Sequence, residues 1–205
     1  MGHRKPGERL DIYGLAKTFS TSVTPVRDAL HMLSQEGLVN IKPRSGYFVA
    51  RITLKELRDL LDLRKILEVA AVERAALVAT RDQIEEMRNV HAGYTGDDDE
   101  SYDRYTDENR RFHYLVALAS GNKELAEQVG RLHDKLARFM VLRRAGKSQE
   151  DTHARIVDAL DLHDVEASRQ ALLNDIEPSR DAILNDVLDD VAASWNLDSY
   201  FNARR

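Results

Sequence analysis

Near the N-terminus, the residues best suited to chemistry are hydrogen-bond donors at the start of a short helical segment. Ser22 and Thr24 offer hydroxyl groups, Val23 lies between them, and Arg27 follows at helical spacing. A hydroxyl can donate to a phosphate oxygen, and a guanidinium can bind a phosphate or the two acceptors of a guanine base. The pattern predicts contact with a nucleic acid, although an isolated arginine is more simply a solvated surface charge.

A second pair of candidate residues lies in the turn of a predicted hairpin. Arg44 supplies a positive charge, and Gly46 has no side chain, so the backbone there could approach a groove of DNA. Strands are expected over residues 38–41 and 46–49, on either side of this turn. The pair therefore predicts a contact that the helix alone would not make.

These side chains must be positioned by two helices that precede the hairpin. A helix is expected over residues 10–19, and a second one follows Ser22, whose hydroxyl could cap it. Pro25 falls in the first turn, where its missing N–H is harmless, and Gly37 ends the helix. Helix, helix and hairpin in this order predict a winged helix-turn-helix.

Composition and charge restrict the classes of protein. The 205 residues include no cysteine, which excludes disulfides and thiolate metal sites. No apolar run reaches the length of a membrane span, so we expect a cytoplasmic protein without a membrane partner. Residues 1–50 carry seven Lys/Arg and four Asp/Glu, whereas the remainder carries 23 and 31. Net charges of +3 and −8 suit nucleic-acid contact at one end of the chain.

Together, the N-terminal motifs resemble the GntR family of bacterial transcription regulators. The matching segments are Pro6–Leu10, Thr24–Arg27, Glu36–Val39 and Pro43–Gly46. The resemblance implies a DNA-binding domain over residues 1–51 that binds a double-stranded operator. Its expected contacts are Ser22, Val23, Thr24, Arg27, Arg44 and Gly46.

The chain departs from the family pattern in this domain. Family members often carry arginine at the position of Val23, and a Glu-Arg pair at Ile12-Tyr13. They also carry a further helix before the position of Pro6, so the first helix of the domain is expected to be missing here. These departures leave more of the contact to Arg27, Arg44 and the hydroxyl groups.

From residue 53 onward the pattern is helical, and it resembles the all-helical FCD-type domain of the FadR-like branch. Thr53 and Glu56 form a capping-box sequence before a helix that is expected to run to residue 79. Pro178 is expected to kink or split the last helix, over residues 165–193. The resemblance implies a mainly α protein with an effector-binding and dimerisation domain over residues 53–195 and a tail over 196–205.

Many members of this branch hold a divalent metal among the helices, and the resemblance places its ligands at Asn109, His113, His153 and Asp175. The family usually has Asp at the first of these positions and His at the last, where this chain has Asn109 and Asp175. The ligand set therefore still contains one carboxylate, at the last position instead of the first. Imidazole nitrogens with oxygen donors suit Zn, Ni, Mn or Fe. His113 and His153 could instead be structural histidines bonded to backbone or water. In another helix register the substitutes would be His133, Asp151 and His163.

Arg64 is the candidate for binding an effector. Members of this branch commonly sense small carboxylates, and a guanidinium can hold a carboxylate through two hydrogen bonds. An ion pair with Glu68, four residues later, is an equally good interpretation. The chain is therefore expected to be a homodimeric, ligand-responsive regulator, most simply a repressor. The alternatives are a metal-dependent enzyme and a helical interaction protein whose N-terminal domain no longer binds DNA.

Overall fold

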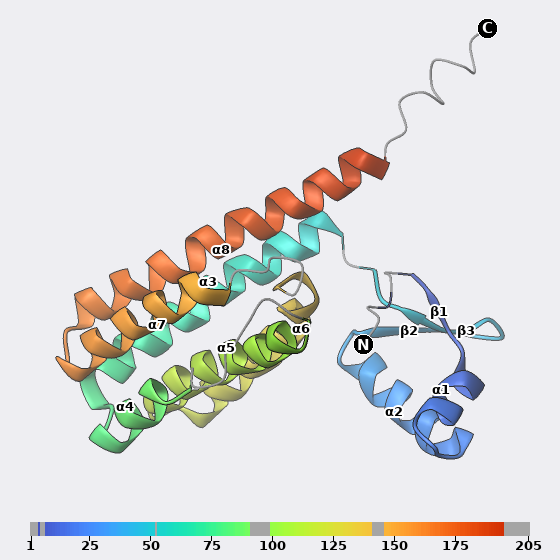
Figure 1. Cartoon of the computed structure of the whole chain (residues 1–205), viewed down its shortest axis with the longest axis horizontal. Coiled ribbons are helices and arrows are strands. Elements are labelled where there is room, and N and C mark those ends of the chain that lie inside the picture. Colours follow the sequence, from blue (N-terminus) through green and yellow to red (C-terminus); the bar gives the residue numbers. More distant parts are fainter. Residues whose placement is uncertain (1–3, 5–6, 52, 91–98, 141–145, 195–205) are drawn as a thin grey trace, which may run out of the picture. The chain divides into compact units, whose positions relative to one another are not determined.

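The computed structural model describes residues 4, 7–51, 53–90, 99–140 and 146–194. The chain divides into two compact units, Met1–Leu57 and Arg58–Arg205, and each is described by itself. Within the described residues there are eight helices and three strands, which confirms the expected mainly α fold with a small β-hairpin wing (Figure 1).

The first unit is a winged helix-turn-helix. Its elements are β1 (Arg9–Leu10), α1 (Ile12–Thr18), α2 (Val23–Gln35), β2 (Val39–Lys42) and β3 (Gly46–Val49). Its small core is formed by Ala16, Val26, Leu30 and Val39, with one or two residues from each of α1, α2 and β2. Apolar residues of α2 at a spacing of four place one side of that helix against the core and leave the other side exposed.

The three strands form an antiparallel sheet in the order β1-β3-β2. In β2 and β3, Lys42 pairs with Gly46 across the turn, and Val39 pairs with Val49 at the other end. Strand β1 was not predicted, because its two residues carry no periodicity and pair only with residues 47 and 48. Because Leu10 belongs to β1, helix α1 begins later than predicted, at Ile12. Asp11 caps this helix by accepting a hydrogen bond from the backbone N–H of Tyr13 at 3.0 Å.

The second unit is a helical bundle. Its helices are α3 (Leu54–Val78), which begins in the first unit, α4 (Arg81–Arg88), α5 (Asp99–Ala119), α6 (Lys123–Met140), α7 (Gly146–Asp161) and α8 (Val165–Ser194). The predicted capping box opens α3, since Thr53 N–H donates to Glu56 at 2.7 Å and Glu56 N–H donates to Thr53 Oγ1 at 3.1 Å. None of the described helices has an apolar stretch long enough to cross a membrane.

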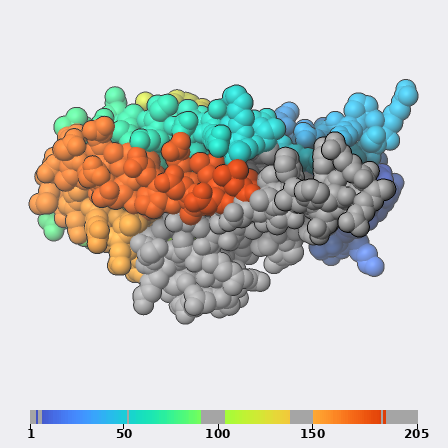
Figure 2. All heavy atoms as spheres, turned by 90° about the horizontal axis from the view of Figure 1, so that it is seen from above, coloured from blue at the N-terminus to red at the C-terminus, as the bar shows by residue number. Residues whose placement is uncertain are grey.

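The bundle core is built from apolar side chains of α3, α4, α5, α7 and α8. Fully buried members include Val72, Phe112, Ile156, Leu160 and Leu172. Helices α3 and α8 run side by side, as adjacent bands in Figure 2. Ion pairs link them along this line, including Lys65–Glu177 at 2.6 Å and Arg180–Asp62 at 3.1 Å. These surface ion pairs connect α3 to α8, and the buried sides of the same two helices carry polar side chains of the site.

Of the predicted kink or split at Pro178, the split does not occur, because α8 continues through the proline to Ser194. A proline removes one N–H donor from the helix, but burial of the flanking turns can offset that loss. Ile176 and Ser179 are buried on either side of Pro178, and Ile183 is buried one turn later. The predicted tail over residues 196–205 lies outside the described residues.

Candidate DNA-reading surface and buried polar cluster

The first turn of α2 presents the predicted hydrogen-bond donors to solvent. Ser22, Thr24 and Arg27 are exposed, Val23 is half-buried, and Val26 faces the core. Ser22 occupies the N-cap position, but its side chain forms no capping hydrogen bond. The start of the helix therefore keeps its hydroxyl and guanidinium groups on one accessible surface, as a recognition helix requires.

The hairpin turn has an unusual backbone. Arg44 adopts φ 63° and Gly46 adopts φ 110°, both in the left-handed region. A glycine takes up such a conformation readily, whereas an arginine does so at a cost of about 1–2 kcal/mol. The turn thus holds the exposed Arg44 side chain at the tip of the wing, and strain of this kind is typical of functional surfaces.

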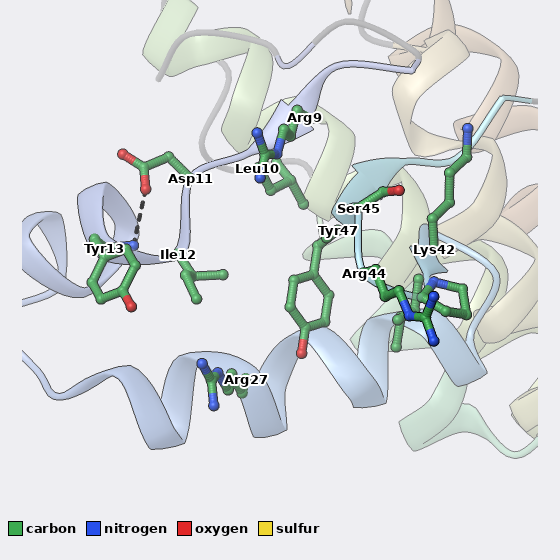
Figure 3. Close-up of a pocket in the computed structure, with 13 residues that line it drawn as sticks. Arg9, Leu10, Asp11, Ile12, Tyr13, Arg27, Lys42, Arg44, Ser45 and Tyr47 are labelled. Atoms are coloured by element: carbon green, nitrogen blue, oxygen red, sulfur yellow. Dashed lines mark hydrogen bonds between the residues drawn. The ribbon is translucent and has the colours of Figure 1, made fainter.

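A hollow of about 590 Å³ lies between the helices and the wing. Figure 3 shows Arg27 on α2, Arg44 on the hairpin turn and Tyr13 on α1 around it. Arg9 and Lys42 also line the hollow, and the one acid among the lining residues is Asp11, which is engaged in capping α1. A concave surface with four cations and one acid is suited to a polyanion such as a nucleic-acid backbone.

A second candidate site is a polar cluster buried inside the helical unit. Five helices contribute to it: α3, α5, α6, α7 and α8. None of its side chains belongs to a residue more than 4% exposed. The members are Arg64, Glu68, Asn109, His113, His133, His153 and Asp175. So many buried ionisable groups are costly unless they bind one another or a ligand.

One part of this cluster has the spacing of metal ligands. His113 Nε2 lies 3.5 Å from Asp175 Oδ2, and His153 Nε2 lies 3.6 Å from Asp175 Oδ1. Four ligands at about 2.1 Å around a tetrahedral ion are separated by about 3.4 Å. Asp175 Oδ2 is buried and accepts no hydrogen bond from a described residue. These three residues therefore fit a divalent ion.

Neighbouring groups fix the orientation of these three side chains. The His153 ring stacks on Phe112 with centroids 3.9 Å apart and planes at 8°. Thr152 Oγ1 donates to Asp175 Oδ1 at 2.5 Å. Asn109 is buried one turn before His113 on α5, as the predicted pair requires. The site is thus held in shape by protein contacts alone.

The other part of the cluster has the spacing of hydrogen bonds. Glu68 Oε1 lies 2.8 Å from His133 Nε2 and accepts from Arg64 Nε at 2.7 Å, while Glu68 Oε2 lies 2.6 Å from His113 Nδ1. These distances are too short for groups that share a metal ion but are ordinary for hydrogen bonds. Glu68 therefore joins Arg64 and His133 through hydrogen bonds and lies in close polar contact with His113.

His113 joins the two parts of the cluster. Its Nδ1 lies 2.6 Å from Glu68 Oε2, and its Nε2 lies 3.5 Å from Asp175 Oδ2 and 3.2 Å from Arg64 Nη2. A carboxylate behind an imidazole orients the ring and makes it a better metal ligand. Arg64 thus lies against the same nitrogen that the metal prediction assigns to the ion.

Burial and charge set the protonation of this network. Burial by itself would raise the pKa of Glu68, but the nearby Arg64, His113 and His133 hold that pKa well below its ordinary value. Burial lowers the pKa of His133 to about 4, against the opposing effect of Glu68. At neutral pH the network therefore contains a charged Glu68 and a neutral His133.

The structure brings the predicted ligand positions into one buried region and places two of the three substitutes, Asp151 and His163, outside it. Asp151 is exposed, and His163 Nδ1 bonds to the carbonyl of Ala76 at 2.9 Å, away from the cluster. His133 belongs to the cluster, through Glu68. The sequence suggested Glu68 only as an ion-pair partner of Arg64; its bonds to two histidines, 45 and 65 residues away, carry no local signal.

Comparisons with known proteins agree with both units. The model of the bacterial regulatory proteins of the gntR family matches residues 1–49, and the FCD domain model matches residues 59–177, more than half of the chain. The chain is 29% identical over 183 residues to the uncharacterized HTH-type transcriptional regulator YdhC of Bacillus subtilis, covering 84% of this chain and 80% of that protein.

It is also 29% identical over 189 residues to the HTH-type transcriptional repressor GlaR of Escherichia coli, covering 84% and 86% of the two chains. The solved structure of E. coli McbR/YncC superposes with a TM-score of 0.73 at 21% identity, covering 90% of each chain, which shows the shared fold. These relatives are transcription regulators, and none of them supports the alternative of a metal-dependent enzyme. The chain belongs to the GntR family of bacterial transcription regulators and carries the FCD type of helical domain.

Proposed function

We propose that this protein is a homodimeric repressor that releases its operator when a small carboxylate binds in the helical unit. The observation that carries the proposal is the buried polar cluster. Arg64 Nη1 is buried and has no hydrogen-bond partner among the described residues, although Nε and Nη2 of the same guanidinium are engaged. A buried donor of this kind is costly unless a ligand or a water completes it.

A carboxylate matches the free part of Arg64. The guanidinium presents its donors in a planar fork, so Nη1 and Nη2 can bind both oxygens of one carboxylate. A hollow of about 300 Å³ is lined in part by Phe112 and His153. It therefore reaches the polar cluster at His153. A hollow of that size accommodates a small organic acid and excludes a large ligand.

A divalent ion would be held by His113, His153 and Asp175, with Asn109 as the fourth ligand. Such an ion would supply a Lewis-acidic position for a carboxylate oxygen. The contributions of the protein itself are the ring orientation imposed by Glu68 and Phe112 and the positive charge of Arg64. Zn, Ni, Mn and Fe all suit this mixture of nitrogen and oxygen donors.

Dimer formation is supported by an apolar stripe on α3. Leu63, Ile66, Leu77 and Val78 are exposed, at 43%, 66%, 69% and 57%. At 3.6 residues per turn they fall within about a third of the helix circumference. An exposed apolar stripe of this kind is typical of an interface. The two N-terminal units of the dimer, here called its heads, would then bind two half-sites of a near-palindromic operator.

Repression is favoured by the relationship to GlaR, whose name describes a repressor. Effector binding can weaken operator binding only as far as the effector prefers the dimer arrangement that binds DNA poorly. Gel shifts with genomic fragments that flank the gene test the DNA-binding part, and Arg27→Ala should weaken the complex. Retained affinity in Arg27→Ala would remove α2 from the DNA contact.

The sensing part is tested by calorimetry with a panel of small organic acids, on metal-loaded and on chelator-treated protein. Arg64→Lys keeps the charge but loses the planar fork, so it should weaken binding of the active acid at least tenfold. Arg180→Lys is the matched control, since Arg180 lies in an exposed pair with Asp62. If no acid binds in either state of the protein, the carboxylate proposal is abandoned.

Metal content provides an independent measurement. His153→Ala should lower the amount of bound divalent metal in purified protein, whereas His163→Asn should not. His163 lies outside the cluster and has φ 54°, a conformation that asparagine tolerates. Equal metal content in the two variants would count against the proposed ligand set.

A further inference from the structure

Arg9, on the first strand of the N-terminal unit, lies beside the predicted DNA contacts of the wing. Arg9 is exposed and pairs with Phe48 across β1 and β3. Its guanidinium lies across Gly46, because a Cβ atom on that glycine would meet Arg9 Nε at 3.5 Å and Nη2 at 3.7 Å. The Arg9 guanidinium therefore lies beside Gly46 and adds a third arginine to this end of the wing.

Arg9 shares the hollow with the cations already described. Arg27, Lys42 and Arg44 line the same surface, and none of the guanidinium groups of Arg9, Arg27 and Arg44 forms a hydrogen bond or an ion pair within the described part of the chain. Lys42 lies over the Phe48 ring at 4.8 Å from its centroid, on the same face of the sheet as Arg9. Like charges gathered without counter-ions repel one another, so the arrangement is unfavourable until an anion binds.

The neighbours of Arg9 explain why a cation is useful at this position. Ile12 and Tyr13 of α1 line the same hollow and contribute no positive charge. The first turn of α2 offers Arg27 as its one cation, since Val23 and Thr24 are uncharged. The residues of α1 that line the hollow therefore bring no charge to it, and Lys17, the cation of α1, does not line it.

We propose that Arg9 contacts the phosphate backbone of DNA beside the wing, supplying from β1 a positive charge that the hollow-lining residues of α1 do not carry. The inference rests on the DNA-reading function proposed above and adds a residue that its recognition helix and wing turn do not include. A phosphate contact positions the protein without reading bases. Loss of Arg9 should therefore weaken binding to all duplexes alike.

The test measures operator and mixed-sequence duplex binding at several salt concentrations, using the full chain. The slope of log K against log salt falls by about 0.9 for each phosphate contact that is lost. Arg9→Gln keeps most of the stem and should reduce the slope by that amount for each head of the dimer. Between 50 and 200 mM salt this corresponds to about 3.5-fold less salt sensitivity per head. Arg9→Lys should retain the slope.

Arg51→Gln is the matched control, because Arg51 is exposed in the same unit but does not line the hollow. All variants are compared after thermal melts show equal folding, and Arg9→Thr, whose side chain suits a strand, replaces Arg9→Gln as the variant without the charge if the latter melts early. An Arg9→Gln slope equal to those of wild type and Arg51→Gln overturns the assignment. So does a loss confined to the operator, which would indicate a base contact. Absence of salt-dependent binding by the wild-type protein overturns the DNA-reading function itself, a result distinct from a silent Arg9.

Discussion

Replacing Arg64 with methionine should strongly destabilise the helical unit. The guanidinium donates to Glu68 at 2.7 Å, contacts His113 Nε2 at 3.2 Å and lies 3.9 Å from Asp175 Oδ2. Methionine fills similar space but leaves two carboxylates buried without a cation. Breaking a buried ion pair from one side typically costs about 3–5 kcal/mol of unfolding free energy. With a urea dependence of about 2 kcal/mol per molar, the midpoint should fall by about 2 M.

The assay is urea unfolding followed by far-ultraviolet circular dichroism, at one fixed protein concentration because the proposed dimer would add to the apparent stability. Removal of both charges in Arg64→Met/Glu68→Leu should recover at least half of the loss, since no unpaired Glu68 carboxylate remains. Arg180→Met is the control for a surface pair and should cost less than about 1 kcal/mol. The reasoning fails if Arg64→Met costs no more than Arg180→Met, or if the double variant is no more stable than the single one.

Three further predictions concern other parts of the molecule. In chelator-treated protein, unfolding free energy should fall as pH falls from 6.5 toward 4, because unfolded His133 takes up a proton that the buried ring, with a pKa of about 4, does not. The loss of unfolding free energy is roughly 3 kcal/mol at most. Urea unfolding at several pH values should show a weaker pH dependence in His133→Gln. Arg44→Gly should raise the unfolding free energy by about 1 kcal/mol, because it relieves backbone strain, and should weaken DNA binding. A melting temperature that falls together with the affinity in gel shifts would contradict this. Ile66→Glu should convert the dimer to a monomer in light scattering, whereas an unchanged mass would exclude the α3 stripe as the interface.

Much of the fold could be predicted from the sequence because local signals determine it. The Thr53 capping box, the proline in the first turn of α2 and the Gly46 turn each act over a few residues. Strand β1 escaped prediction because its pairing with β3 spans more than thirty-five residues. The split considered at Pro178 could not be excluded from the sequence, because the burial on both sides of the proline is a tertiary property.

In the candidate site, too, the local features could be predicted from the sequence and the long-range contacts could not. The i,i+4 pairs Arg64–Glu68 and Asn109–His113 were visible as spacing within one helix. The contacts of Glu68 with His113 and His133 depend on how three helices pack, which no local pattern reveals. The distances also separate a metal-like group from a hydrogen-bonded one, a distinction that residue types alone cannot make.

The contribution of five helices to one cluster also bears on how the helical unit unfolds. Withdrawal of α8 removes Asp175, withdrawal of α6 removes His133, and withdrawal of α3 removes both Arg64 and Glu68. Each partly unfolded form would leave charges in an apolar interior without their partners. Intermediates are therefore penalised, and the unit should open as a single cooperative block whose slowest amide protons are spread over all five helices.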